Sequence, residues 1–515
     1  MLETSACRRA VRERDARTDG MFVAADPACG TYCRPSCPAG PTEPDDVVLL
    51  SSAAVAQQSG YRPCRRCVPD AVPGWAERGR WGTLPARALR LVADGTFQRV
   101  GTIGVAALLG CSDRDLDHSL ATELGAGVAV LDHAYRTHTA RVLLQTSPLP
   151  AHDVALATGF TGTDQLEDAV VQIFGVTVAA LHAAVTRDRP EDTATAVPGH
   201  VRLRLGFEAP MHTGWSGWFL SGHALSGLES WDSPDPGADG TPTPGRYGRT
   251  LALPRAPGAM TVTLQQARVD LSLRLGDLRD LGTAVVRVGR LLDLDADPAA
   301  IDAALGADEH LRTSVAAAPG IRVPGSVDGA EVLLRTVIGQ QVSLAAARTA
   351  GSRLVAALGV PLPPIGGGPA GTAGGASTSA LTHLFPTSTV IAERGREVLT
   401  GPARRIDTVV RVAGLLAGGD LVVNPGRDAD TLRAELLAVK GIGPWTADYV
   451  LMRVLGHPDV LLTSDLVLRQ GAELLGIGDL VGAASRWSPW CSYAGMHLWK
   501  HALDVRARRR QTRSR

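Results

Sequence analysis

The sequence predicts a multidomain, mainly α-helical protein with two small α/β parts. The chain has 515 residues, enough for roughly three to five domains at about 100–200 residues each. Helical periodicity runs through residues 81–185 and resumes from about Val285, whereas alternating strand patterns occur only between residues 200 and 275. Five of the eight cysteines fall within residues 29–67. This segment shows little hydrophobic periodicity and cannot bury a large core, so it needs a stabilising cross-link.

The composition excludes several classes of protein. Hydrophobic residues make up 45% and charged residues 20% of the chain, which excludes wholesale disorder. The 52 basic residues balance the 52 acidic residues, so no global positive charge points to nucleic acid. No run of about 18 apolar residues occurs, and the N-terminus lacks the apolar core of a secretory signal. We therefore expect no membrane span.

Four of the cysteines form two close pairs, Cys33 with Cys37 and Cys64 with Cys67, separated by about 26 residues. This spacing is typical of a tetrahedral zinc site, which four thiolates would close. Bound Zn²⁺ would supply the folding energy that so small a segment lacks. From spacing alone a purely structural zinc site is the commoner outcome, so a chemical role needs further support.

The residues around the pairs supply that support. The strings DGMFVAAD, GTYCRPSCPAG and GYRPCRRCVPD resemble the N-terminal domain of Ada-type alkylation-response proteins over residues 15–72. The resemblance implies that the four cysteines bind zinc and that Cys33 accepts a methyl group from a methylphosphotriester in DNA. A zinc-bound thiolate stays nucleophilic near neutral pH. Arg34, Arg65 and Arg66 flank the site and are expected to hold phosphates, whereas Cys29 is expected to be a free thiol.

Residues 81–186 read as a series of short helices. Two segments, TIGVAALLGCSDRDLDHSLATELG and LPAHDVALATGFTGTDQLEDAVVQIFG, place Gly110 and Gly159 where a helix-turn-helix needs a permissive residue. Taken alone, such a pattern is more often a generic helical bundle. Because it follows the Ada-type segment, it resembles the double helix-turn-helix domain of AraC-type regulators.

The charges of the two expected recognition helices argue against base reading. Residues 112–124 contain four acidic residues and one Arg, and residues 161–174 contain three acidic residues and no basic one. Side chains that read bases are usually Arg, Lys, Asn or Gln, and DNA itself is anionic. We therefore expect this domain to fold, to have lost most sequence-specific DNA binding, and to serve as a spacer or protein contact.

The string LLAVKGIGPWTADYVLM at residues 436–452 predicts a helix-hairpin-helix. The first helix is expected to end at Lys440. Gly441 and Gly443 allow a tight turn with exposed N–H groups, and Pro444 can start the second helix without losing a hydrogen bond. Those N–H groups and the helix N-terminus form a cradle for a DNA phosphate.

Asp465 follows in the string LLTSDLVLRQ, at an expected helix start. The structural interpretation of this carboxylate is helix capping, and the catalytic one depends on context. The context is the hairpin together with LLDLDADP, PGIRVPGSVDGAEVLLRTVIGQQVSLAAARTA, THLFPTS and WSPWCSYAGMHLW. Over nearly all of residues 200–500 the chain resembles the AlkA type of 3-methyladenine DNA glycosylase II, in the helix-hairpin-helix superfamily.

The resemblance implies a mechanism and its residues. An N-alkylated purine is already cationic and leaves without a general acid, so Asp465 would stabilise the oxocarbenium ion left on the sugar. The flipped base would stack on Trp445, Tyr449 and Trp499, although Tyr449 would pack equally well as core. Gln341 occupies the position of the residue that fills the gap left by the base. No lysine occupies the Schiff-base position, so no lyase step is expected.

These interpretations divide the chain into a methyl-acceptor domain (1–80), a helix-turn-helix domain (81–186), a linker (187–199), an AlkA-type α/β subdomain (200–284), a glycosylase domain (285–505) with a flexible insertion (361–380), and an Arg-rich tail (506–515). The tail is most simply a disordered contact to DNA, and a solubilising role is nearly as plausible.

The leading functional prediction is a monofunctional DNA-3-methyladenine glycosylase joined to a zinc-held methyl acceptor. Its partner would be alkylated double-stranded DNA and its one cofactor Zn²⁺, with no cofactor for the glycosylase. The alternative is a methylation-activated transcriptional regulator that contacts the transcription machinery, and a third interpretation is a DNA-binding adaptor with both sites inactive. We expect a monomer in the bacterial cytoplasm, associated with the nucleoid.

Overall fold

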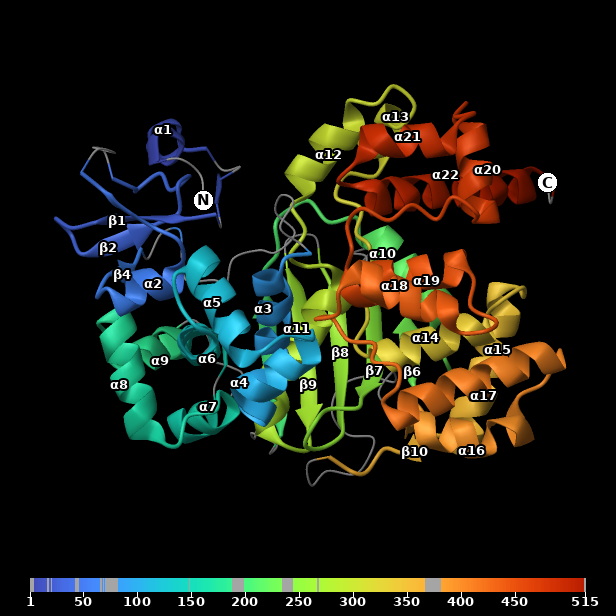
Figure 1. Ribbon diagram of the computed structural model, residues 1–515, viewed down its shortest axis with the longest axis horizontal. Helices are drawn as coiled ribbons and strands as arrows, with labels where there is room; N and C mark the ends of the chain where they lie inside the picture. Colours follow the sequence, from blue (N-terminus) through green and yellow to red (C-terminus); the bar gives the residue numbers. More distant parts are fainter. Residues whose placement is uncertain are drawn as a thin grey trace. The chain divides into compact units, whose positions relative to one another are not determined.

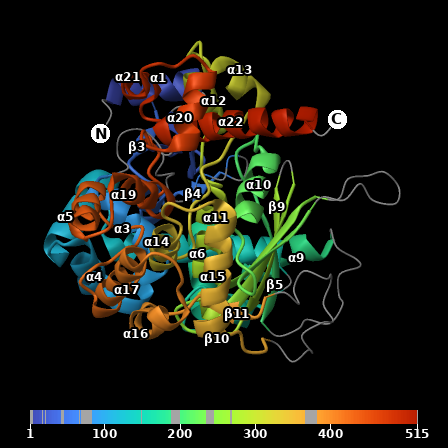
Figure 2. The same cartoon turned by 90° about the vertical axis from the view of Figure 1, so that its right-hand side faces the viewer.

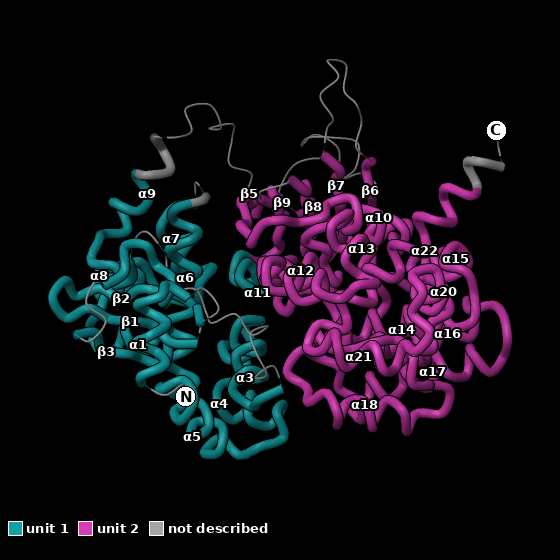
Figure 3. Tube along the Cα trace, turned by 90° about the horizontal axis from the view of Figure 1, so that it is seen from above, with its two compact units in different colours: residues 1–196, 278–283 teal, residues 197–277, 284–515 magenta. Residues whose placement is uncertain are grey.

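The computed structural model describes residues 4–513 apart from residues 16–17, 20, 42–45, 65–66, 68, 70–81, 148, 188–198, 234–243, 266–267 and 366–380. The chain forms two compact units, residues 1–196 with 278–283 and residues 197–277 with 284–515 (Figure 3). Helices dominate both units, which confirms the predicted mainly α-helical, multidomain fold class. No helix in the described part of the chain is long and apolar enough to cross a membrane. The finer domain boundaries stay a prediction.

The first unit contains a small sheet, with α1 before it in the sequence (Figure 1). Of the four paired cysteines, Cys33 lies in this sheet and the others follow its strands. The strand order is β3–β1–β2–β4, with β2 and β4 parallel and the other neighbours antiparallel. Its elements are α1 (Thr4–Glu13), β1 (Val23–Asp26), β2 (Thr31–Cys33), β3 (Val48–Leu50), α2 (Ala53–Gln58) and β4 (Arg62–Pro63). The sequence did not predict α1, because its buried face consists only of Cys7, Ala10 and Val11.

The described part of the same unit continues with seven helices, which contain the two predicted helix-turn-helix pairs, α4 with α5 and α7 with α8. Gly110 and Gly159 adopt left-handed φ angles of 74° and 78° in the two turns, as the sequence predicts. The helices are α3 (Leu84–Ala93), α4 (Thr96–Leu109), α5 (Asp113–Leu124), α6 (Val128–Thr146), α7 (Ala151–Ala157), α8 (Thr163–Phe174) and α9 (Val178–Arg187).

Helix α2 packs on the cysteine-bearing sheet and also joins the core of the helices in this unit. Ala54 of α2 is buried in the same cluster as Leu89 of α3 and Leu116 of α5. Ser52, the N-cap of α2, donates its hydroxyl to Leu124 O at 2.8 Å. The two parts therefore stabilise each other through apolar burial as well as through the chain that links them.

The second unit is built around a five-stranded antiparallel sheet of order β5–β9–β8–β7–β6. Its strands are β5 (His200–Leu205), β6 (Glu229–Asp232), β7 (Arg246–Leu251), β8 (Gly258–Leu264) and β9 (Val269–Leu275). Strands β5, β8 and β9 confirm the alternating patterns expected between residues 200 and 275. Helix α10 (Thr213–His223) packs against β6 and β7.

Among the described residues, the other elements of the second unit are helices and the short strand pair β10 (Val360–Pro361) and β11 (His383–Leu384). The helices are α11 (Leu281–Leu292), α12 (Pro298–Gly306), α13 (Arg312–Ala317), α14 (Gly329–Ile338), α15 (Leu344–Leu358), α16 (Ser388–Val398), α17 (Ala403–Gly418), α18 (Ala429–Ala438), α19 (Pro444–Val450, extended by the π-helical η4, Leu451–Leu455), α20 (Leu466–Leu474), α21 (Leu480–Trp487) and α22 (Cys491–Arg513). The turn η2 (Leu278–Asp280) and the first three residues of α11 belong to the first unit.

The Arg-rich tail differs from its expected disordered form. Helix α22 continues to Arg513 (Figure 2). Residues 506–513 therefore extend a helix that Tyr493 and Leu498 already anchor in the core. Once a helix is nucleated, each added residue gains a hydrogen bond at little further entropic cost, which allows a charged segment to follow it.

Candidate active site and metal centre

The four predicted zinc ligands lie together beside strands β2 and β4. Cys33 ends β2, Cys37 lies in the turn that follows, and Cys64 comes directly after β4 with Cys67 three residues later. The four Sγ atoms lie within 4.8 Å of one another, and those of Cys37 and Cys64 are 3.9 Å apart. Tetrahedral zinc with Zn–S bonds of about 2.3 Å places its sulfurs about 3.8 Å apart, so this donor set fits Zn²⁺.

The thiols need a cation in order to be deprotonated together. The hydrogen bond to Cys67, burial and the neighbouring thiols raise the pKa of Cys33 well above its usual range, and burial raises the pKa of Cys37 to about 11. The hydrogen bond from Cys33 lowers the pKa of Cys67 to about 6. One thiolate is thus favoured at neutral pH, and bound Zn²⁺ would compensate the charge of the others.

Of the predicted phosphate contacts at this site, only Arg34 can be placed, because Arg65 and Arg66 lie outside the described residues. The backbone N–H of Arg34 donates to Cys67 Sγ at 3.4 Å. Cys29 is exposed and stands apart from the cluster of four.

In the second unit, Asp465 is the N-cap of α20, and its carboxylate accepts four hydrogen bonds. Oδ1 accepts the backbone N–H groups of Val467 at 2.9 Å and Leu468 at 2.8 Å. Trp499 Nε1 donates to the same oxygen at 2.8 Å, and Trp445 Nε1 donates to Oδ2 at 3.0 Å. The carboxylate therefore caps its helix and is also fixed between two indoles from α19 and α22.

A cavity of about 550 Å³ opens beside this carboxylate, and Asp465, Trp445, Tyr449 and Trp499 all line it. The Trp445 and Tyr449 rings stack with centroids 5.1 Å apart and planes 11° from parallel. Tyr449 is only 8% exposed and belongs to the core around α20 and α22, so it serves as core and as cavity wall at once.

Helix α10 supplies a second aromatic wall that the sequence did not predict. Trp218 and Phe219 line the cavity; Trp218 is 41% exposed and stacks on the buried Trp215 with centroids 5.2 Å apart. The guanidinium of Arg453 lies 4.6 Å above the Phe219 ring. The aromatic run in HTGWSGWFLSGH was the available signal, but nothing local indicates that it meets residues more than 200 positions away.

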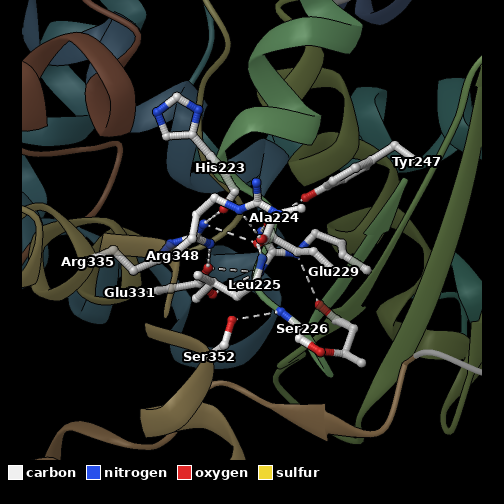
Figure 4. A network of polar contacts seen from close by, with 12 residues as sticks. His223, Ala224, Leu225, Ser226, Glu229, Tyr247, Glu331, Arg335, Arg348 and Ser352 are labelled. Atoms are coloured by element: carbon white, nitrogen blue, oxygen red, sulfur yellow. Dashed lines mark hydrogen bonds and ion pairs between the residues drawn. The ribbon is translucent and has the colours of Figure 1, made fainter. Parts of the chain in front are cut away.

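Four charged side chains, three of them buried and that of Arg335 half-buried, also line the cavity and form one network (Figure 4). Arg249 Nη2 and Arg335 Nη1 donate to Glu331 at 2.8 Å and 2.7 Å, and Arg335 Nη2 lies 3.1 Å from Glu229 Oε2. Tyr247 donates its hydroxyl to Glu229 Oε1 at 2.6 Å. Burial opposes ionisation, but Arg335 and Arg249 lower the pKa of Glu229 to about 2. The network therefore stays charged and ties the sheet to α14.

The predicted hairpin turn is present, although α18 ends two residues before Lys440. Gly441 has a φ angle of 101°, and a Cβ there would lie 2.2 Å from Thr408 Oγ1, so both conformation and contact require glycine. Gly443 is the N-cap of α19 and Pro444 its first residue, as the sequence predicts. Lys440 is exposed beside this turn.

Gln341 lies in the turn between α14 and α15 and is exposed. It is one of three described non-glycine residues with a positive φ angle, 58°. A left-handed conformation of this kind is uncommon for a residue that bears a side chain.

Two parts of the chain match known protein families. The profile of the metal binding domain of Ada matches residues 6–70, and that of the AlkA N-terminal domain matches residues 202–328. A Mycobacterium tuberculosis protein described as "Probable bifunctional transcriptional activator/DNA repair enzyme AlkA" is 44% identical over 499 residues, covering 96% of this chain and 95% of that protein. The chain belongs to the Ada–AlkA fusion family.

Shorter relatives match one part of the Ada–AlkA chain each. The "DNA-3-methyladenine glycosylase 2" of Escherichia coli is 28% identical over 300 residues, 57% of this chain and 95% of that protein. The "Bifunctional transcriptional activator/DNA repair enzyme Ada" of the same organism is 40% identical over 62 residues, 12% of this chain and 18% of that protein.

In this Ada–AlkA protein the predicted site residues form three groups. The four cysteines form the metal cluster, and Asp465 with its three aromatic neighbours forms the cavity wall. Lys440, Gly441 and Gly443 of the hairpin turn, and Gln341 of the turn after α14, are absent from the cavity lining. Among the described residues, sequence reasoning missed the α10 aromatics and the α14 charges, because both reach the cavity only through tertiary packing.

Proposed function

We propose that the second unit is a DNA glycosylase that releases alkylated bases of the 3-methyladenine type by hydrolysing the N-glycosidic bond. The observation that carries the proposal is the carboxylate of Asp465, which four N–H donors fix at the edge of an aromatic-lined cavity. A cationic base, flipped from the duplex, would stack against Trp445 and Tyr449.

The chemistry needs little from the protein beyond this arrangement. The bond between the sugar C1′ and the base nitrogen breaks, and its electron pair leaves with the alkylated base, which is neutralised by the departure. Asp465 stabilises the positive charge left on the sugar. Water then adds to C1′ and loses a proton. Neither lysine of the sequence lines the cavity, which supports a monofunctional hydrolase with no Schiff base.

The proposal for the first unit is methyl transfer to Cys33. Zn²⁺ held by Cys33, Cys37, Cys64 and Cys67 would keep the thiols ionised at neutral pH. Cys33 Sγ attacks the methyl carbon of a methylphosphotriester, an S–C bond forms, and the C–O bond breaks to leave an ordinary phosphodiester anion. The backbone N–H of Arg34 stabilises the neighbouring Cys67 sulfur.

Transcriptional activation is the second candidate function, and the helix-turn-helix pairs together with the names of the relatives favour it. The exposed surface opposes it: Asp113 and Asp115 on α5, and Asp164 and Asp168 on α8, are all exposed. We propose that these helices read DNA sequence weakly and act as a spacer or protein contact. A monomeric state and a contact with the transcription machinery also remain proposals.

One experiment tests both enzymatic proposals. The zinc-loaded full chain is incubated with duplex DNA that has been treated with a methylating agent. The released bases are identified by chromatography, and the mass of the peptide that contains Cys33 is measured by mass spectrometry. Free 3-methyladenine and a single added methyl group on Cys33 are the expected products. Absence of base release contradicts the glycosylase, and an unmodified Cys33 contradicts the methyl acceptor, so the two proposals can fail separately.

A further inference from the structure

The turn that carries Gln341 is connected to the phosphate-binding hairpin by its neighbour, Gln340. The amide Nε2 of Gln340 donates to Gly441 O at 3.1 Å and to Thr446 Oγ1 at 3.0 Å. Gly441 is part of the hairpin turn, and Thr446 is a buried residue of the helix that follows it. One side chain thus bridges segments about one hundred residues apart in the sequence.

Helix α17 holds the same two turns from another side. Arg405 Nη1 donates to Gln340 O at 3.2 Å, and Arg411 Nη1 donates to Lys440 O at 3.1 Å. Gly441 approaches α17 so closely that it has no room for a Cβ beside Thr408. The hairpin and the turn of Gln341 are therefore fixed to one helix and, through Gln340, to each other.

The other end of the connection reaches the cavity. Helix α14, which leads into the turn, contains Glu331 and Arg335 of the buried charge network, and Arg335 Nη2 also donates to His223 O at 2.5 Å (Figure 4). A helix anchored by buried ion pairs cannot rotate without breaking them, which would leave uncompensated charges. The position of Gln341 relative to the cavity is thus set at both ends of α14.

We infer that Gln340 is the positioning residue that couples phosphate binding by the hairpin to insertion of Gln341 into the duplex. The inference rests on the proposed glycosylase function. With Gln340 in place, backbone contact at the hairpin fixes the insertion of Gln341 and the entry of the flipped base into the cavity. Without Gln340, the hairpin still binds phosphate, but the turn that carries Gln341 is free to shift. DNA affinity is then retained while base flipping is impaired.

Gln340→Met tests the inference, because Met has nearly the length of Gln but cannot donate a hydrogen bond. Loss of two hydrogen bonds of ordinary strength corresponds to about 30-fold, or about 2 kcal/mol, in single-turnover base release at saturating protein. Affinity for undamaged duplex should stay within about threefold of wild type, since the phosphate-binding N–H groups are unchanged. Thr446→Val, which removes one of the two acceptors, should give a smaller loss in release.

A spectroscopic readout separates positioning from general damage to the fold. In an Asp465→Asn background, an alkylated duplex with 2-aminopurine next to the target base should brighten when Gln341 enters and unstacks it. Adding Gln340→Met should remove most of that signal at full occupancy. Gln145→Met, at an exposed glutamine of α6, is the control for the chemical change and should alter neither signal nor release.

Each outcome decides the question. The coupling is supported if the wild-type chain releases the base while Gln340→Met loses both base release and the fluorescence signal but keeps its affinity for undamaged DNA. The coupling is overturned if base release and fluorescence in Gln340→Met stay within about threefold of wild type. It is also overturned if the affinity for undamaged DNA falls as much as base release does, because Gln340 would then act only in phosphate binding by the hairpin. If the wild-type chain releases no base, the proposed function fails, while the fluorescence comparison still reports on the coupling.

Discussion

Replacing Asp465 by Asn should abolish base excision while leaving the fold and the affinity for alkylated DNA largely intact. The change removes one negative charge and almost no volume. At a separation of about 4 Å and an effective dielectric constant of about 20, a carboxylate and a developing unit positive charge interact by about 4 kcal/mol. That energy corresponds to about a 10³-fold loss in the rate of bond cleavage.

The structure also bounds the effect on stability. Asn is about as good an N-cap as Asp, and its Oδ1 can keep the bonds from Val467, Leu468 and Trp499. Its Nδ2 would then face Trp445 Nε1, donor against donor, where a 3.0 Å hydrogen bond stands in the wild type. Loss of that bond costs about 1–3 kcal/mol of unfolding free energy, too little to unfold the unit.

The assay is single-turnover release of 3-methyladenine from alkylated duplex, with binding measured in parallel. Asp479→Asn is the matched control, because Asp479 caps α21 through Gly482 N at 2.9 Å and is absent from the cavity lining. It should release base at the wild-type rate. Retention of even a tenth of wild-type release by Asp465→Asn would refute the assignment and show that another residue carries the chemistry.

Four further predictions follow from other features of the chain. Chelation of zinc should unfold the sheet of the first unit, seen by circular dichroism, and leave base release unchanged. Methylphosphotriester DNA should add one methyl group to Cys33, and a methyl group on Cys29 in the mass spectrum would contradict the assignment. Selection of the full chain on a random duplex pool at physiological salt should enrich no motif bound at nanomolar affinity, because the recognition helices are acidic. Burial lowers the pKa of His223 to about 4 and that of His497 to about 3, below the ordinary 6.5, so the unfolded state takes up protons first as the pH falls. The free energy of unfolding should therefore drop between pH 6.5 and pH 4, by about 2 kcal/mol per histidine at pH 5, in urea titrations followed by tryptophan fluorescence.

Features with a local cause were predictable from the sequence. The two cysteine pairs, the glycines of the turns and the start of α19 at Pro444 each follow from spacing or backbone freedom within a few residues. The helix-capping role of Asp465 is local as well, and the structure confirms it. The catalytic role assigned to that carboxylate stays a prediction.

Features that depend on tertiary contact were not predictable. Glu331 and Arg335 read as a polar stripe of α14, and only their partners on β6 and β7 make them a buried network. Gln340 and Gln341 are identical and adjacent in the sequence. The positive φ angle of Gln341 separates them, so that one side chain is exposed while the other bonds to the hairpin.

The scarcity of lysine gives the hairpin a practical property. The sequence contains only Lys440 and Lys500, and Lys500 Nζ binds Asp504 within α22, whereas Lys440 is exposed. A lysine-specific protease therefore has one readily accessible cleavage site in the whole chain, at the turn proposed to bind a phosphate. Cleavage there would split the native protein into two fragments. The rate of this cleavage would fall when a bound molecule covers the turn, and it therefore reports binding without a label.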